Sequence, residues 1–213
     1  MARVKNGILG GFSGKVGTVV GYNLGQESYI RSRPIRRAKY TDNELANMAR
    51  FKLVQDCLSP LKDLLKVGFK GYGTKTGGYR SAVSYTRKVA LVADDAGFYI
   101  DPALLKVSGG NLPQAASPSV AYESPLKIKF NWNISDVPYE FSSDQVLLVV
   151  YDMEEKTALT CIFNGAFRNA GTQTIELTAD YKGKTLHTYI GFVAADRSAQ
   201  SDSQYLGTVS VPA

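Results

Sequence analysis

The chain has 213 residues, of which 44% are hydrophobic and 21% charged, as is ordinary for a folded soluble protein with one large domain or two small ones. No run approaches the roughly 18 apolar residues that a membrane-spanning helix needs. The opening MARVKNGILGG is too short and too glycine-rich for a secretory signal peptide. We therefore expect synthesis in the cytoplasm without export. The formal net charge is +6, but the charges are unevenly distributed. Residues 1–90 carry 17 Lys and Arg and 5 Asp and Glu, whereas residues 91–213 carry 8 Lys and Arg and 14 Asp and Glu. This distribution indicates two modules with different partners, or one copy of the chain that docks onto the next.

A glycine-rich stretch, GGFSGKVGTVVGYNLG, occupies residues 10–25. A phosphate-binding loop of the Walker type needs a hydroxyl residue directly after its Gly-Lys pair, because that hydroxyl holds Mg²⁺. Here Gly14 and Lys15 are followed by Val16, and no strand pattern precedes them. We therefore interpret the stretch as extended structure and not as a nucleotide site.

A β-ribbon arm is predicted over residues 10–35. Two β-rich runs, KVGTVVGYNL and ESYIRSRP, are separated by a turn signal around Gly25. Gly17 and Gly21 lie four residues apart, so they share one face if the first run is a single strand. A face without side chains suits the close approach of a neighbouring backbone or aromatic ring. Both glycines are therefore predicted interface residues.

The densest basic stretch of the chain, RSRPIRRAKY, follows from the second leg of this ribbon. It contains Arg31, Arg33, Arg36 and Arg37, and its Pro34 excludes it from a central strand. Tyrosines are interleaved with these charges, as the stacking surface of a nucleic-acid binder requires, although packing in a core or an interface explains them as well. The four arginines are predicted to contact either phosphates or the carboxylates of another protein surface.

Helical signals begin directly after the basic stretch. Thr41 and Glu44 have the spacing of a capping box, and Pro60 restarts a helix because proline fits a first turn. We predict two helices in tandem, or one kinked helix, over about residues 42–68. Its apolar stripes are Leu45, Ala49, Leu53 and Cys57 in the first part, and Val54, Leu58, Leu61 and Leu65 across the junction.

A third helix is predicted over about residues 78–91, after a loop rich in glycine. Its apolar face consists of Tyr79, Ala82, Val83, Thr86 and Ala90. Its outer face carries Arg80, Arg87 and Lys88, which are predicted to contribute to the same basic binding surface as the ribbon.

The pattern changes to a period of two after about residue 96. Lys127–Trp132 alternates between polar and apolar residues, whereas QVLLVVYD is continuously apolar, as in a strand covered on both sides. Further short strands are predicted in ALTCIF, QTIELT, LHTYIGFV and SQYLGTVSV, with weaker candidates in FYID and ALLKVSGGNLP. The predicted fold is therefore α+β: a basic N-terminal module over residues 1–95, followed by an antiparallel immunoglobulin-like β-sandwich over residues 96–213.

The N-terminal half resembles a known family. The residues that carry the resemblance are MARVKNGILGGFSGKVGTVVG, then IRSRP, then the helix with ARFKLVQDCLSPLKDLLKVGF. They are similar to an uncharacterised family of Bacteroidota, a domain of unknown function. The resemblance covers residues 1–90 closely and the β-rich half more loosely, and it implies no activity, cofactor or binding residue.

The sequence contains no arrangement of residues typical of a catalytic or metal-binding site. His187 is the only histidine, and acid–base pairs and metal sites need partners. Neither Ser13 nor Ser28 stands in a motif with a base. We therefore expect no catalytic, cofactor or metal site, and a protein that is not an enzyme.

Two functional hypotheses remain. The first is a structural protein whose N-terminal ribbon docks onto copies of itself or onto other structural proteins of a larger particle, such as a phage or prophage virion. The alternative is a nucleic-acid-binding protein that uses the basic ribbon and the third helix against phosphates.

Overall fold

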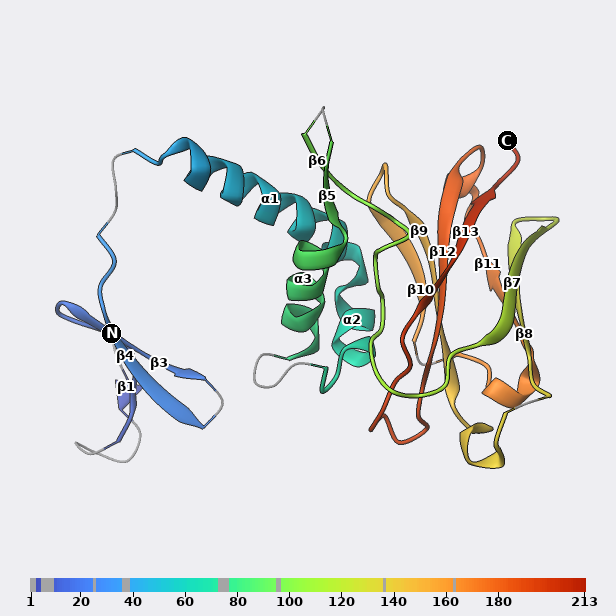
Figure 1. The fold of residues 1–213 in the computed structure, drawn as a ribbon, viewed down its shortest axis with the longest axis horizontal. Helices are drawn as coiled ribbons and strands as arrows, with labels where there is room; N and C mark the ends of the chain where they lie inside the picture. The colour runs from blue at the N-terminus through green and yellow to red at the C-terminus, as the bar shows by residue number, and fades with distance from the viewer. Residues whose placement is uncertain are drawn as a thin grey trace. The chain divides into compact units, whose positions relative to one another are not determined.

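The computed structural model describes residues 3–4, 10–24, 26–35, 39–72, 77–94, 97–135, 137–162 and 164–213. The chain divides into two compact units, Met1–Ala46 and Asn47–Ala213. The first unit contains a β-ribbon, and the second contains helices and antiparallel sheets (Figure 1). The fold is therefore mixed α and β, as the sequence predicts.

The ribbon consists of strands that follow one another in the order β1-β2-β3-β4. These are β1 (Arg3–Val4), β2 (Phe12–Val16), β3 (Val19–Leu24) and β4 (Glu27–Ser32), and neighbouring strands pair antiparallel. The run KVGTVVGYNL is thus not one strand, which corrects the sequence interpretation. It contains a two-residue turn at Gly17 and Thr18, because Val16 pairs directly with Val19.

The two glycines predicted to share a strand face have different roles. Gly17 has a φ of +53°, at the first central position of the hairpin, where type II′ turns place glycine. Gly21 lies inside β3, opposite Gly14 and Ile30. A Cβ at Gly21 would lie 2.3 Å from the backbone oxygen of Phe12 and 2.6 Å from its ring. The bare stretch of strand is therefore covered by a ring of the same chain.

The helices are α1 (Asp42–Leu58), α2 (Lys62–Gly68) and α3 (Gly78–Val89), and a 3₁₀ turn, Ser59–Leu61, joins the first two at the predicted proline. The capping box is formed, since the Glu44 amide donates to Thr41 Oγ1 over 3.3 Å and the Thr41 amide donates to the Glu44 carboxylate over 2.9 Å. The predicted helical range 42–68 is confirmed. The third helix ends two residues earlier than predicted, because Leu91 begins a strand.

Only the second of the two apolar stripes predicted for the first helical segment is buried. Val54, Leu58, Leu61 and Leu65 are fully enclosed. In the first stripe Leu45 and Ala49 are exposed, and the buried residues of α1 are confined to its last turns. The helix joins the core only there, so its earlier apolar side chains face outward.

The second unit contains a four-stranded sheet, β10-β9-β12-β13, and a three-stranded sheet, β11-β8-β7, with a short hairpin, β5-β6. The strands are β5 (Leu91–Asp94), β6 (Gly97–Ile100), β7 (Ala116–Glu123), β8 (Lys127–Asn133), β9 (Gln145–Asp152), β10 (Thr157–Cys161), β11 (Thr172–Glu176), β12 (Thr185–Val193) and β13 (Gln204–Ser210). The sequence analysis missed β7, whose Pro118 is tolerated because this strand lies at a sheet edge.

The two central strands of the four-stranded sheet, β9 and β12, are buried on both faces. Val149, Tyr151 and Tyr189 belong to one core with the helices, whereas Val146, Leu148 and Val150 share a second core with strands of the three-stranded sheet. Successive residues of β9 therefore point alternately into two different cores. This double cover explains why QVLLVVYD is continuously apolar, as predicted.

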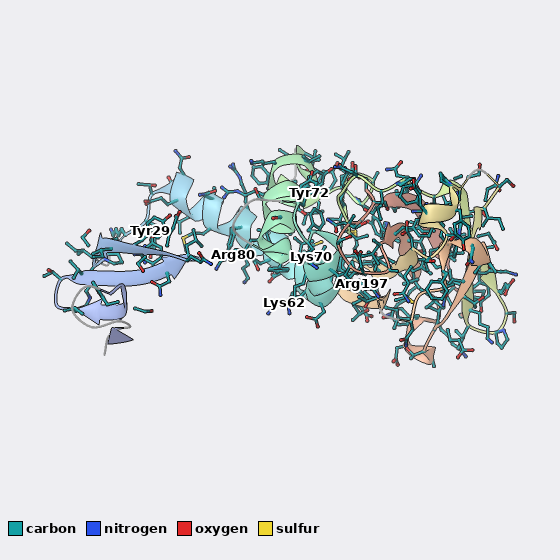
Figure 2. The ribbon with its side chains drawn as sticks, turned by 90° about the horizontal axis from the view of Figure 1, so that it is seen from below. Tyr29, Lys62, Lys70, Tyr72, Arg80 and Arg197 are labelled. Carbon is teal, nitrogen blue, oxygen red and sulfur yellow. The ribbon has the colours of Figure 1, made fainter. Side chains whose placement is uncertain are left out.

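Hydrogen bonds also tie the helices to the β-rich part of the second unit. The Tyr151 hydroxyl donates to the Cys57 carbonyl over 2.8 Å, and Lys70 Nζ donates to the Arg197 carbonyl over 2.9 Å (Figure 2). The two compact units are defined by contacts within the chain, whereas a domain is defined by its ability to fold on its own. The predicted domain boundary near residue 95 therefore stays a prediction.

Candidate functional site

The strand register gives the ribbon two chemically different faces. Residues directly opposite each other in neighbouring strands point to the same side of a sheet, and the side alternates along each strand. We name one side the cationic face, which carries Lys15, Val20, Tyr22, Leu24, Glu27, Tyr29 and Arg31. We name the other side the apolar face, which carries Phe12, Gly14, Val16, Val19, Gly21 and Ile30, with the polar residues Asn23, Ser28 and Ser32 on the same side.

The apolar face leaves large side chains open to solvent. Val16 is 50% exposed and Ile30 is 65% exposed. Phe12 covers only the strip around Gly21, where its ring replaces a missing side chain. Apolar residues that stand together on one sheet face and lack a cover form a surface suited to protein contact.

The cationic face contains an aromatic pair across two strands. The rings of Tyr22 and Tyr29 are stacked, with centroids 5.5 Å apart and planes 17° apart. The guanidinium of Arg31 lies 5.7 Å from the centre of the Tyr22 ring. The Tyr29 hydroxyl donates to the Glu27 carboxylate, and this hydrogen bond is the main cause that raises the pKa of Tyr29. The tyrosine therefore stays neutral and adds no charge to the face.

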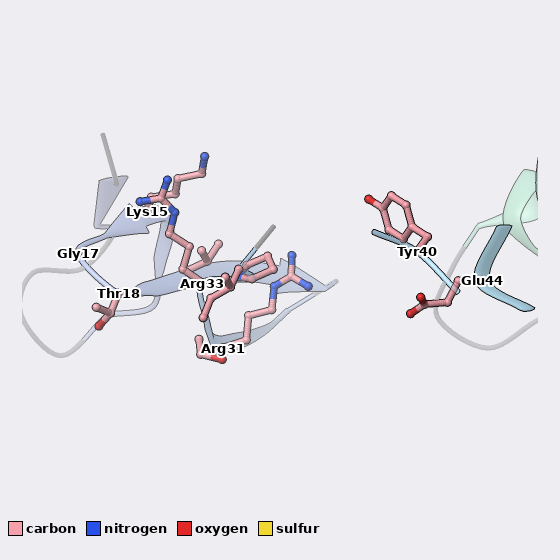
Figure 3. Close-up of a pocket in the computed structure, with 11 residues that line it drawn as sticks. Lys15, Gly17, Thr18, Arg31, Arg33, Tyr40 and Glu44 are labelled. Atoms are coloured by element: carbon pink, nitrogen blue, oxygen red, sulfur yellow. The ribbon is translucent and has the colours of Figure 1, made fainter. Parts of the chain in front are cut away.

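Three cations line one hollow beside this face. Figure 3 shows Lys15, Arg31 and Arg33 projecting from the ribbon, and the same hollow is lined by Thr18, Tyr40 and one carboxylate, Glu44. The backbone amide of Arg33 donates to the Thr18 carbonyl over 2.7 Å and so holds the end of β4 against the turn. Within the described ranges, no carboxylate forms an ion pair with any of the three cations.

The predicted basic residues thus separate into groups. The structure brings Arg31 and Arg33 together, whereas Arg36 and Arg37 lie outside the described residues. Gly17 lines the same hollow as the two described arginines through its place in the turn, and Gly21 lies under Phe12.

The cations of the third helix belong to the second unit and line a groove between α1 and α3. Arg80, Arg87 and Lys88 border it, and its apolar residues include Phe51 and Val83. Arg87 also donates to the side-chain oxygen of Asn47. A groove with an apolar floor and a basic border is chemically suited to an anionic amphipathic group.

His187 lies half-buried in β12, and burial lowers its pKa. Its Nδ1 is 2.9 Å from the hydroxyl oxygen of Tyr205. Over the part of the chain that the structure describes, no cluster of three or more His, Cys, Asp and Glu residues is arranged to hold a metal ion. Nor does any helix in those ranges have the length and apolarity needed to cross a membrane.

Sequence reasoning missed two contributors to these surfaces. Lys15 was considered only as part of a phosphate loop, although a Gly-Thr hairpin turn after Val16 would have placed it on the same sheet face as Arg31, with Val20 between them. Phe51 was not singled out, because it falls outside both predicted apolar stripes of its helix, and no sequence signal marks its 47% exposure.

Comparison with known proteins gives a family match. A family model described as "Family of unknown function (DUF6266)" matches residues 11–207, which include strands β2–β4 of the ribbon, the helices and most of the β-rich part. The match confirms the predicted resemblance to a domain of unknown function. No curated protein shows a significant match to the sequence.

Proposed function

The chain belongs to this family of unknown function, and we propose from its geometry that it is a non-enzymatic structural protein which docks into a larger assembly through its N-terminal ribbon. Its partners in this proposal are copies of itself or other structural proteins of the particle. A phage or prophage virion is the kind of particle that we propose, because extended arms that reach a neighbouring subunit are common devices in such particles.

The observation that carries the proposal is the uncovered apolar face of the ribbon. Val16 and Ile30 stand on the same side of the sheet with half or more of their surface open to solvent. Each fully buried Val or Ile side chain stabilises a structure by about 1.5–3 kcal/mol relative to leaving it exposed. A partner that covers this face would gain much of that free energy.

The size of the ribbon supports the same proposal. A sheet of a few short strands becomes stable when one of its faces is packed against another layer. Here the apolar side chains are present for such a layer, and the described residues of the first unit do not cover Val16 or Ile30. We propose that the second layer is supplied by the partner.

We propose in addition that the β-rich part of the second unit is an immunoglobulin-like sandwich that serves as the outward module of the particle subunit. The shared core between strands β8, β9 and β12 supports this. The sandwich would present a surface while the ribbon fixes the subunit in the assembly.

The first test changes the apolar face alone. Replacing Val16 and Ile30 together by serine should abolish oligomers of the full chain, measured by mass photometry over a range of concentrations, because the contact loses its apolar area. The matched control, Val16→Leu with Ile30→Val, keeps the face apolar and should retain oligomers. Oligomers that persist in the serine variant contradict docking through this face. A wild-type chain that stays monomeric at high concentration contradicts self-assembly.

The second test removes the ribbon. A chain without residues 1–39 keeps Thr41 and Glu44, whose capping box begins α1. We expect it to keep the circular dichroism and cooperative melting of the second unit, because the two cores of that unit contain no residue of the ribbon. It should nevertheless fail to assemble. Loss of the folded state on truncation would mean that the ribbon is part of the core and not a docking arm.

A further inference from the structure

The cationic face of the ribbon does not take part in the proposed apolar contact. In the strand register of the ribbon, Lys15 and Arg31 flank Val20 on the side opposite to Val16 and Ile30. A partner layer on the apolar face would therefore leave this side open. We propose that the cationic face binds single-stranded nucleic acid.

The cations of this face are not neutralised by ion pairs within the described residues, although the Arg31 guanidinium lies over the Tyr22 ring and Glu44 lines the same hollow. No carboxylate within the described ranges forms an ion pair with Lys15, Arg31 or Arg33. Lys15 on β2 and Arg31 on β4 lie on either side of Val20 of β3 and line one hollow with Arg33, so three positive charges gather on one side of the ribbon, which favours a bound polyanion. Arg31 and Arg33 are two residues apart along an extended strand, or roughly 7 Å, which offers successive charges to a backbone that runs along the strand.

The tyrosine pair adds an aromatic surface on which bases can stack, which a surface that binds phosphate alone does not need. Tyr22 is 43% exposed and Tyr29 is 37% exposed, although the two rings are stacked on each other. Unpaired bases stack on exposed aromatic rings beside a basic groove, and this contact tolerates any base sequence. Bases inside a duplex are already stacked on one another and cannot use such rings. The combination therefore points to a single strand and not to a duplex.

The position of Arg31 joins the two kinds of contact. Its guanidinium lies over the Tyr22 ring, 5.7 Å from the centre, and the ring holds it beside the aromatic pair. A nucleotide stacked at the pair would place its phosphate within reach of this guanidinium. The Glu27 carboxylate also lies on this face, at the end of the aromatic pair away from Arg31, where it accepts a hydrogen bond from the neutral Tyr29 hydroxyl. The phosphate would therefore lie at the Arg31 end of the pair.

The experiment measures binding of a fluorescently labelled oligothymidine of about 15 nucleotides to the full-length chain by anisotropy, a length in the range that one small β-domain covers. Measurements at several salt concentrations give the slope of log K against log salt. We expect binding at low salt that weakens steeply as salt rises. A duplex of the same length should bind at least tenfold more weakly.

Two variants address the two kinds of contact. Lys15→Ser with Arg31→Ser should weaken binding and reduce the salt slope by about 1.4, the value for two phosphate contacts on a single strand. Tyr22→Ala with Tyr29→Ala should weaken binding about tenfold or more with little change in slope, whereas Tyr22→Phe with Tyr29→Phe keeps the rings and should bind as the wild type does.

Matched controls separate this proposal from the proposed assembly. Val16→Ser with Ile30→Ser alters only the apolar face, and Arg80→Ser with Lys88→Ser alters only the third helix, so both should bind within about twofold of wild type after correction for oligomeric state. No binding by the wild type at low salt would overturn the proposal. Equal binding of duplex and single strand, or an unchanged affinity in the two cationic-face variants, would overturn it too. Loss of binding only in the Arg80 and Lys88 variant would place the contact on α3 instead.

Discussion

Replacing Arg168 by alanine should lower the free energy of unfolding of the second unit by about 3–5 kcal/mol, because the change leaves a buried carboxylate without its partner. The Arg168 side chain is 1% exposed, and that of Asp144 is 6% exposed. Their nitrogen and oxygen lie 3.2 Å apart. Arg168 also donates to the carbonyls of Pro113 and Gln114, over 2.8 and 3.3 Å.

The same guanidinium fills space in the core shared by the two sheets. It lies 3.7 Å from the centre of the Phe192 ring. Trp132 packs edge-on against that ring and donates its indole N–H to the Arg168 carbonyl over 2.7 Å. Since Trp132 is the only tryptophan of the chain, urea unfolding followed by its fluorescence reports directly on this core.

The loss should depend on pH in a defined direction. Burial raises the pKa of the Asp144 carboxyl, and Arg168 opposes this rise. Without the arginine the pKa rises further, so the folded variant takes up a proton at a pH where the unfolded chain has lost it. Stability then falls as pH rises from about 4 through the raised pKa, and the deficit should be smaller near pH 4 than at pH 7.

A double variant provides the control for this pair. Arg168→Met with Asp144→Asn removes both charges while keeping most of the volume, so it should recover part of the lost stability at pH 7. A loss below 1 kcal/mol in Arg168→Ala, with no dependence on pH, would contradict the structural role given to the pair.

The elements whose signals are local could be predicted from the sequence. Thr41 and Glu44 mark the start of α1 because the capping box is made by residues three positions apart. The polar–apolar alternation of β8 and the continuous apolar run of β9 predicted both strands correctly. Each pattern reflects whether one face or both faces of the strand are buried. The mixed fold followed from these patterns.

Features that depend on distant residues could not be predicted. Arg168 was not singled out, because nothing near it in sequence shows that Asp144, Phe192 and the carbonyls after Leu112 converge on it. The exposure of Leu45 also depends on which elements reach the helix, and periodicity does not contain that information. Within the ribbon, the sequence interpretation was wrong because it treated KVGTVVGYNL as one strand and missed the turn at Gly17 and Thr18. This turn makes the residues before Gly17 pair with those after it, and so changes which side chains share a face.

Gly21→Val should disrupt the ribbon itself, and this is the second large effect. A Cβ at this position would lie 2.3 Å from the backbone oxygen of Phe12, and a backbone atom cannot move aside as a side-chain tip can. Overpacking of this kind costs about 1–3 kcal/mol. Gly17→Val should also destabilise the ribbon, by about 1–3 kcal/mol, because its φ of +53° is unfavourable for a β-branched residue.

Hydrogen exchange of the β2–β4 amides, measured beside oligomer formation, distinguishes this expectation from the interface role first predicted for the two glycines. In Gly21→Val both the amide protection and the oligomers should be lost together, since an unfolded ribbon cannot present its apolar face. Gly17→Asn is the matched control at the turn, because asparagine tolerates a positive φ far better than valine, and it should keep most of the protection. If Gly21→Val kept full amide protection and lost only its oligomers, the glycine would face the partner and not Phe12. The strand would then lack a side chain at this position so that a partner can approach it closely, as the sequence predicts.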